Sequence, residues 1–145
     1  MRLVIDASVA AKWALPARAE PLSEEAFDLL SRYTNGEIQL VVPDLFWAEL
    51  ANVFWKAARL KRVTASAAKG ALQAIVEYNF PTIASRETLE LAFALATAFD
   101  RSVYDSLYVA VAISTKSQLV TADEKLANAM AARFPVKWLG AANLY

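Results

Sequence analysis

The sequence predicts an α/β fold, a three-layer α/β/α sandwich around a mainly parallel sheet. Short apolar runs rich in Val and Ile recur along the chain, and longer segments with helical spacing of apolar residues separate them. Strands that alternate with helices in this way are typical of a parallel sheet covered on both faces. No linker, repeat or low-complexity stretch interrupts the 145 residues, which predicts a single domain over residues 1–145.

The first part of the chain predicts a strand, two helices and a second strand. Residues 2–6 are apolar and β-branched and end at a turn-forming Asp, as a buried strand does. A short helix over residues 8–15 ends before a proline. The next helix, 21–34, opens with a proline and acidic residues and ends at Asn-Gly. Residues 39–42 form another apolar run and predict the second strand.

The middle of the chain predicts four helices and one short strand. Apolar residues recur with helical spacing over residues 43–60, which begin with Pro-Asp, and a further helix covers 64–79. A short strand at 82–84 follows a proline. Two strongly apolar helices, 87–99 and 103–115, come next.

The last part of the chain repeats the strand–helix–strand order. Residues 118–121 predict a strand, 123–133 a helix, and 136–139 a strand at the edge of the sheet. The alternation therefore continues to the end of the chain, as a parallel sheet with connecting helices requires.

The residue types that are missing exclude several kinds of active site. With no Cys and no His, the chain cannot form a Ser-His-Asp or Cys-His site, a histidine acid/base pair, or an ordinary zinc site. The three glycines, at 36, 70 and 140, are too far apart for a P-loop or a dinucleotide-binding turn. The remaining oxygen ligands are those that hard divalent cations such as Mg²⁺ prefer.

Charge and hydropathy bear on partners and location. The net charge is zero, so the chain lacks the global positive charge of many nucleic-acid-binding proteins. The longest stretch without a charged residue, 106–115, is about half a membrane span. Because Asp6 and Lys12 interrupt the apolar N-terminus, a signal peptide is not predicted. We expect no membrane association and a cytoplasmic protein.

Four carboxylates lie beside apolar segments, where an unpaired charge is costly: Asp6, Glu49, Asp105 and Asp123. Asp6 and Asp123 follow predicted strands, and the carboxyl ends of parallel strands are where open α/β sheets bind ligands. Glu49 and Asp105 fall in the first turns of predicted helices that flank the same edge. The four side chains are therefore predicted to meet.

Carboxylates gathered in this way suit metal-dependent phosphodiester hydrolysis. Divalent cations activate water and neutralise charge on the phosphate, and several carboxylates can hold one or two of them. We expect Asp6 and Asp105 to be the principal ligands of Mg²⁺, with Mn²⁺ as the alternative. Glu49 is either a ligand or orients a bound water, and Asp123 completes or supports the site.

Four segments resemble PIN-domain proteins, and most closely the VapC-type toxins of toxin–antitoxin pairs. The matching segments are VIDAS (4–8), AELANV (48–53), YDSLYVA (104–110) and LVTAD (119–123). The resemblance implies an α/β/α fold, a homodimer, cleavage of RNA and a small antitoxin protein as partner. It also implies that Asp6, Glu49, Asp105 and Asp123 are the acidic metal-site residues. Ser8 and Thr121 match accessory polar positions near the metal.

Structural roles are the alternative for each acid. Asp6 could cap the helix that begins near Ser8. The segments 102–105 and 121–124 fit capping boxes. Glu49 could pair with Lys56 or with another cation on a neighbouring element, and Lys12 is either a solvated lysine or a phosphate contact.

Other functions also fit parts of the pattern. A phosphate-transferring hydrolase of the D-x-D type would have a second acid at position 8, where this chain has Ser8. A receiver domain would have an acidic pair at the end of the first strand, which this chain lacks. A non-catalytic binding module that keeps the fold and acts through protein contacts is the remaining alternative to a metal-dependent ribonuclease.

Overall fold

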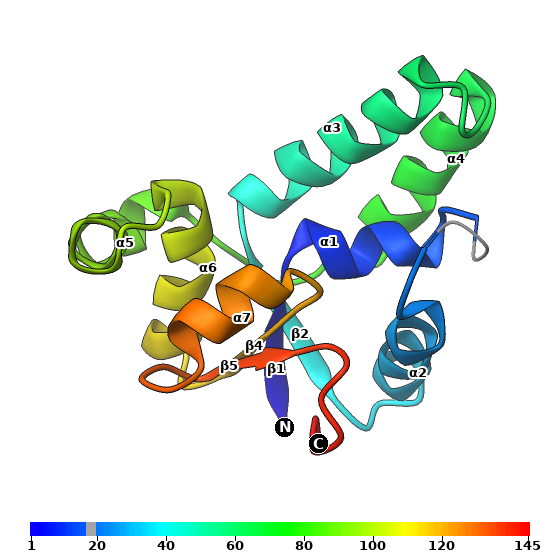
Figure 1. Cartoon of the computed structure of the whole chain (residues 1–145). Helices are drawn as coiled ribbons and strands as arrows, with labels where there is room; N and C mark the ends of the chain where they lie inside the picture. Colours follow the sequence, from blue (N-terminus) through cyan, green and yellow to red (C-terminus); the bar gives the residue numbers. More distant parts are fainter. Residues whose placement is uncertain (17–19) are drawn as a thin grey trace.

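The computed structural model describes residues 1–16 and 20–145, and these form a sheet of five parallel strands with helices on both sides (Figure 1). The strands are β1 (Arg2–Ile5), β2 (Gln39–Pro43), β3 (Thr82–Ile83), β4 (Gln118–Thr121) and β5 (Val136–Trp138). The helices are α1 (Ala7–Ala10), which continues into the 3₁₀ helix η1 (Ala11–Trp13), α2 (Ser23–Thr34), α3 (Leu45–Arg59), α4 (Ala65–Val76), α5 (Ser85–Phe99), α6 (Val103–Ser114) and α7 (Glu124–Met130).

The strands lie in the order β3-β2-β1-β4-β5, with β1 at the centre. Val4 of β1 pairs with Val41 of β2 on one side and with Leu119 of β4 on the other. After β1 the chain builds outward through β2 and β3, and then returns to build β4 and β5 on the other side. The order therefore reverses between β1 and β4, and such a reversal is where ligands bind in open α/β sheets.

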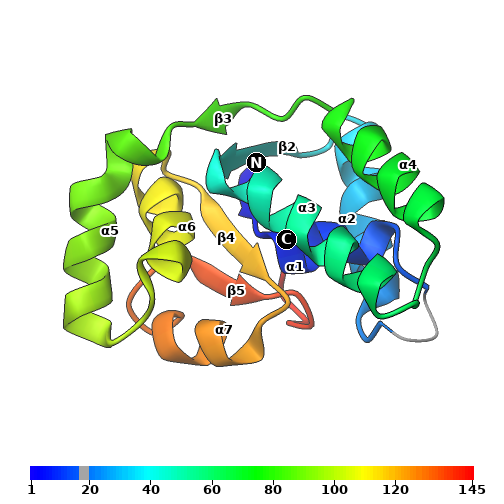
Figure 2. The same ribbon diagram turned by 90° about the horizontal axis from the view of Figure 1, so that it is seen from above.

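The helices divide between the two faces of the sheet, as right-handed crossovers require. Helices α1 to α4 lie on one side of the sheet, and α5, α6 and α7 lie on the other (Figures 1 and 2). Helix α6 packs across β1, β2 and β4, and α5 covers its outer side. The prediction of an α/β fold with a parallel sheet between two helical layers is confirmed.

Burial explains why α6 and α3 hold fixed positions. Residues 106–112 of α6 are all buried, so this helix is enclosed by the sheet and by α5. In α3, the buried residues are Phe46, Leu50, Phe54 and Ala57, which form one apolar stripe with helical spacing. Because both helices are packed in this way, the polar residues that they carry near the strand ends have fixed positions.

The predicted elements all occur, with differences at some ends. The helix expected from residue 21 begins at Ser23, because Leu22 has a left-handed backbone (φ 62°) and stands outside the helix. The last helix ends at Met130, three residues earlier than predicted. The following turn leads into Pro135, and a residue before proline is biased against helical geometry. The strand at 136–139 is confirmed at the edge of the sheet and ends at Trp138.

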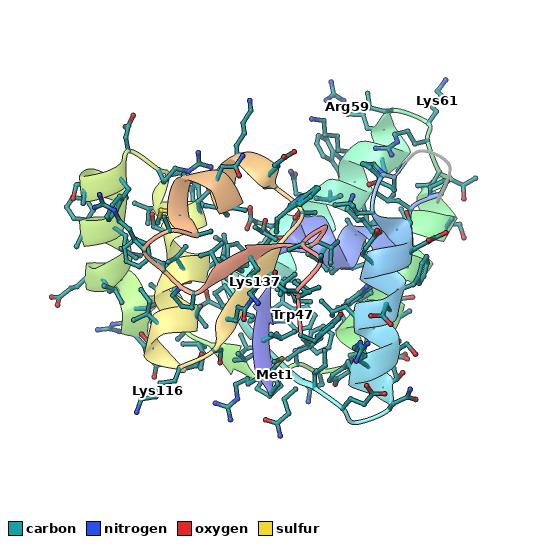
Figure 3. All side chains as sticks on the ribbon, turned by 60° about the horizontal axis from the view of Figure 1, so that its bottom comes forward. Met1, Trp47, Arg59, Lys61, Lys116 and Lys137 are labelled. Carbon is teal, nitrogen blue, oxygen red and sulfur yellow. The ribbon has the colours of Figure 1, made fainter. Side chains whose placement is uncertain are left out.

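Lys12 is not a solvated lysine, so that sequence-based interpretation was wrong. Its side chain is buried and donates to Glu20 at 3.2 Å. Glu20 also accepts from Arg62 at 2.7 Å, which ties the acidic segment near residue 20 to the basic turn between α3 and α4. Figure 3 shows Arg59 and Lys61 projecting at the tip of this helical pair.

Within the described residues, no helix is both long and apolar enough to span a membrane.

Candidate active site

A pocket of about 520 Å³ opens at the carboxyl ends of the central strands, and all four predicted carboxylates line it. Asp6 follows β1 and Asp123 follows β4, so these two acids flank the reversal of strand order. Glu49 comes from the start of α3 and Asp105 from the start of α6. Ser8 also lines the pocket, whereas Thr121 is completely buried behind it.

Asp6 is the most deeply placed of the four acids. The Ser8 hydroxyl donates to its Oδ1 and the Thr121 hydroxyl donates to its Oδ2. The backbone N–H of Val9 also donates to Oδ1 at 3.3 Å, so the predicted cap of the first helix is present. Burial raises the pKa of Asp6 to about 6 from 3.8, and the negative charge of Glu49 adds to the rise. The hydrogen bonds from Ser8, Thr121 and Val9 act in the opposite direction.

Glu49 is held by a tyrosine rather than by a lysine. The hydroxyl of Tyr108 donates to Oε1 of Glu49 at 2.7 Å. Burial raises the pKa of Tyr108 far above its ordinary value, and the charge of Glu49 contributes, so the phenol stays protonated and remains a donor. The alternative pairing of Glu49 with Lys56 does not occur among the contacts of the described residues.

Asp105 forms an ion pair with Arg101, four residues earlier. Nη2 of Arg101 lies 2.9 Å from Oδ2 of Asp105. The Ser102 hydroxyl accepts from the backbone N–H of Asp105 at 3.0 Å and caps α6. Half of the predicted capping box at residues 102–105 is therefore present, while the carboxylate of Asp105 binds Arg101.

Asp123 combines a capping role with a place in the pocket. Its Oδ1 accepts from the backbone N–H groups of Lys125 at 3.0 Å and Leu126 at 3.3 Å, which makes Asp123 the cap of α7. Thr121 was predicted to begin a capping box here, and that was wrong. Its hydroxyl instead accepts from the N–H of Asp123 at 3.0 Å and donates to Asp6, so it connects the two acids.

The donor set fits a hard divalent cation, although the acids are not arranged around a single point. All four acids at the pocket offer oxygen, which Mg²⁺ and Mn²⁺ prefer. Asp6 is buried next to another carboxylate, an arrangement that a cation would relieve. In residues 1–16 and 20–145, however, no three acidic side chains are placed to coordinate one ion.

Two residues that contact the acids were not predicted from the sequence. Tyr108 lies three residues after Asp105, and residues with that spacing share a helix face. Arg101 lies four residues before Asp105 and outside the predicted helix. Helical spacing around Asp105 could have pointed to Tyr108, but nothing in the sequence distinguished Arg101 from a solvated arginine.

The fold and the acidic pocket define the class of protein, and comparison with known families agrees with them. The model of the PIN domain family matches residues 3–131. The chain belongs to the PIN-domain family. A curated relative, Ribonuclease VapC3 from Pyrobaculum aerophilum, is 35% identical over 129 residues, which is 88% of this chain and 93% of the relative. The resemblance to VapC-type proteins that the four segments carry is thus confirmed.

Solved structures share the fold. PAE2754 from Pyrobaculum aerophilum matches with a TM-score of 0.70 and 23% identity, over 96% of this chain and 90% of that chain. VapC20 from Mycobacterium tuberculosis, a sarcin-ricin loop cleaving toxin, matches with a TM-score of 0.66 and 17% identity, over 91% and 95%. VapBC2 from Rickettsia felis, solved with a DNA fragment from its promoter, also gives 0.66, with 14% identity over 95% and 98%.

Proposed function

We propose that this protein is a divalent-metal-dependent ribonuclease that hydrolyses RNA phosphodiester bonds at the acidic pocket. The observation that carries the proposal is the convergence of Asp6, Glu49, Asp105 and Asp123 on one pocket of a PIN domain. The similarity to a relative named a ribonuclease supports RNA as the substrate.

Asp6 and Asp105 would be the principal ligands of Mg²⁺ or Mn²⁺ in this proposal, with Glu49 as a ligand or as the acceptor that orients water. Asp123 would complete or support the site. A cation bound there supplies charge neutralisation for the phosphate and for the leaving oxygen, and lowers the pKa of a bound water.

The residues behind the acids would keep them in position. Ser8 and Thr121 hold both oxygens of Asp6, and Tyr108 holds one oxygen of Glu49. The second oxygen of Glu49 has no hydrogen bond among the described residues. Asp123 uses only Oδ1 for its cap. Outer partners of this kind fix the orientation of metal-binding carboxylates.

A non-catalytic PIN-like module that acts through protein contacts is the second candidate. One observation favours it: no three acids in the described parts of the chain are placed around a common ion. Such a module would neither bind a divalent cation tightly nor lose a function when Asp6 is replaced. Direct measurement of Mn²⁺ binding distinguishes the two candidates.

The assembly and location of the protein are further parts of the proposal. We infer a toxin role with a small antitoxin as partner, because the chain is similar to VapC-type proteins and its pocket is acidic and therefore suited to a basic side chain. A homodimer and a cytoplasmic location, where RNA is available, complete this inference. Co-expression with the neighbouring small reading frame, followed by size-exclusion chromatography with light scattering, tests the complex and the dimer together.

The experiment that tests the activity is cleavage of a total-RNA pool with Mg²⁺ or Mn²⁺. Wild type is compared with Asp6→Asn and Asp105→Asn, and with Glu90→Gln, an exposed acid of α5, as the matched control. We expect cleavage by wild type and Glu90→Gln, suppression by EDTA, and loss in both pocket variants. Equal cleavage by all four proteins would place the activity outside the pocket, and no cleavage would favour the binding module.

A further inference from the structure

Asp105 differs from the other three acids in the kind of partner that holds it. Hydroxyl groups hold Asp6, a phenol holds Glu49, and backbone N–H groups hold Asp123. The partner of Asp105 is the guanidinium of Arg101, a full positive charge 2.9 Å from Oδ2. Asp105, a proposed metal ligand, is therefore already paired with a positively charged side chain of the same protein.

The guanidinium of Arg101 is not fully satisfied in this position. Its side chain is only 22% exposed, and Nε is buried without a hydrogen-bond partner among the described residues. An arginine has five N–H donors, and a buried donor without a partner costs free energy. The guanidinium therefore holds Asp105 by this contact and not as part of a fully hydrogen-bonded network. A competing cation can replace such a contact.

The backbone keeps Arg101 close to the pocket whether or not it contacts Asp105. Asp100, in a left-handed conformation (φ 54°), ends α5, and the backbone N–H of Arg101 donates to Ala96 at 3.3 Å. Ser102 then caps α6. The tight turn between two packed helices fixes the Arg101 Cα, so the side chain can turn only locally.

We propose that Arg101 is an internal counter-ion that holds Asp105 out of the metal-binding arrangement until a divalent cation displaces it. This inference rests on the proposed metal-dependent function. It accounts for two observations together: all four acids line one pocket, yet no three of them in the described residues surround a common point. Release of Oδ2 by Arg101 would free Asp105 to turn toward Asp6 and Glu49.

Electrostatics sets the direction in which Arg101 changes the affinity for the metal. A divalent cation and the guanidinium repel each other and compete for the same carboxylate oxygen. The pair is partly exposed, so solvent screens it and its influence on metal affinity is modest. A residue that only oriented Asp105 would act in the opposite direction, because loss of an orienting partner weakens metal binding.

The test is the affinity of the metal-free protein for Mn²⁺, measured by isothermal titration calorimetry. In Arg101→Gln we expect Mn²⁺ to bind about two- to fivefold more tightly than in wild type, as loss of a partly exposed competing pair predicts. Arg101→Lys keeps the charge and is expected to fall between the two. Arg86→Gln removes an exposed charge at the start of α5, about 20 Å along that helix from its other end, and should not change the affinity.

The outcomes separate this inference from the proposed function. Tighter binding in Arg101→Gln, with an intermediate Arg101→Lys, supports the counter-ion role. Unchanged or weaker binding in both variants, while Asp6→Asn still abolishes Mn²⁺ binding, overturns the counter-ion role and leaves the metal site intact. No Mn²⁺ binding by wild type overturns both. Far-UV circular dichroism and thermal melting verify folding, and Arg101→Lys keeps the test decisive if Arg101→Gln does not fold.

Discussion

The hydroxyl of Tyr108 on α6 donates a 2.7 Å hydrogen bond to Glu49 on α3, so two residues 59 positions apart in sequence meet at one carboxylate. The ring of Tyr108 is buried, which fixes the donor, whereas the carboxylate of Glu49 reaches the pocket. A rigid donor behind this carboxylate limits the directions in which Glu49 can face a ligand.

Tyr108→Phe should therefore lower both stability and activity. The change removes a hydrogen bond to a charged acceptor, and we expect the free energy of unfolding to fall by about 1–2 kcal/mol. RNA cleavage should also fall, because Glu49 loses its fixed orientation. Urea unfolding and the cleavage assay measure the two effects.

Tyr33→Phe is the control, since the Tyr33 ring packs against Tyr78 and Phe80 and its hydroxyl forms no hydrogen bond within the described residues. Equal stability and equal cleavage in the two variants would show that the contact with Glu49 contributes to neither.

The stability of the metal-free protein should depend on the ionisation of Asp6. Its pKa is raised by burial from 3.8 to about 6, so the folded state holds this proton more tightly than the unfolded state does. The contribution of Asp6 to stability is therefore fully present below pH 3.8 and is lost as the pH rises through about 6. The expected loss is about 3 kcal/mol over this window.

Asp6→Asn isolates this contribution, because asparagine does not titrate. Urea unfolding of both proteins in EDTA, from pH 4 to pH 7, should show the variant gaining stability relative to wild type as the pH rises. Carboxylates away from Asp6 contribute equally to both proteins, so only the difference between the two curves is interpreted. A difference that is constant with pH would contradict the raised pKa.

A divalent cation should stabilise the protein by binding the folded state. At a concentration of about 100 times the dissociation constant, the free energy of unfolding rises by about 2.7 kcal/mol. For a chain of this size that corresponds to an increase in Tm of about 5–10 °C. Thermal melting with MnCl₂, compared with KCl at equal ionic strength, measures the shift. EDTA should reverse it and Asp6→Asn should lack it, and an equal shift in both proteins would place the cation elsewhere.

The sequence predicted the order of strands and helices well because local signals set it. The strands at 118–121 and 136–138, for example, can be predicted from their own apolar residues, without information about distant residues. The position of Asp6 and Asp123 at one edge also followed, since both come directly after strands of a parallel sheet. Ends of helices were less accurate, as at Leu22, where the backbone conformation is not visible in the pattern.

The partners of the acids could not be predicted, because they depend on how distant segments pack. Lys12 reads as an exposed helix residue until the turn at Arg62 and the segment at Glu20 are placed beside it. Lys56 lies about two turns after Glu49 on the same helix. The hydrogen bond to Glu49 nevertheless comes from Tyr108 on another helix. The capping box at 102–105 was only half right for a different reason: Arg101, in the turn four residues earlier, binds the carboxylate of Asp105, which therefore does not cap the helix.

Thr121 links the two strand-end acids, and its replacement should disturb both. The completely buried hydroxyl donates to Asp6 and accepts from the N–H of Asp123. Thr121→Val keeps the shape but removes the donor and leaves that N–H without its acceptor, so we expect a loss of about 1–3 kcal/mol in stability. Mn²⁺ affinity should fall about 10- to 100-fold, the usual effect of removing an outer partner of a metal ligand.

Thr121→Ser separates the effect of the hydroxyl from the effect of packing, because serine keeps the hydroxyl and loses only a buried methyl group. It should bind Mn²⁺ nearly as tightly as wild type, while losing about 1 kcal/mol of stability from the missing methyl. Calorimetric titration and urea unfolding of both variants provide the four values needed. If Thr121→Ser weakened Mn²⁺ binding as much as Thr121→Val did, packing rather than the hydroxyl would position Asp6, and the link between the two acids would not matter for metal binding.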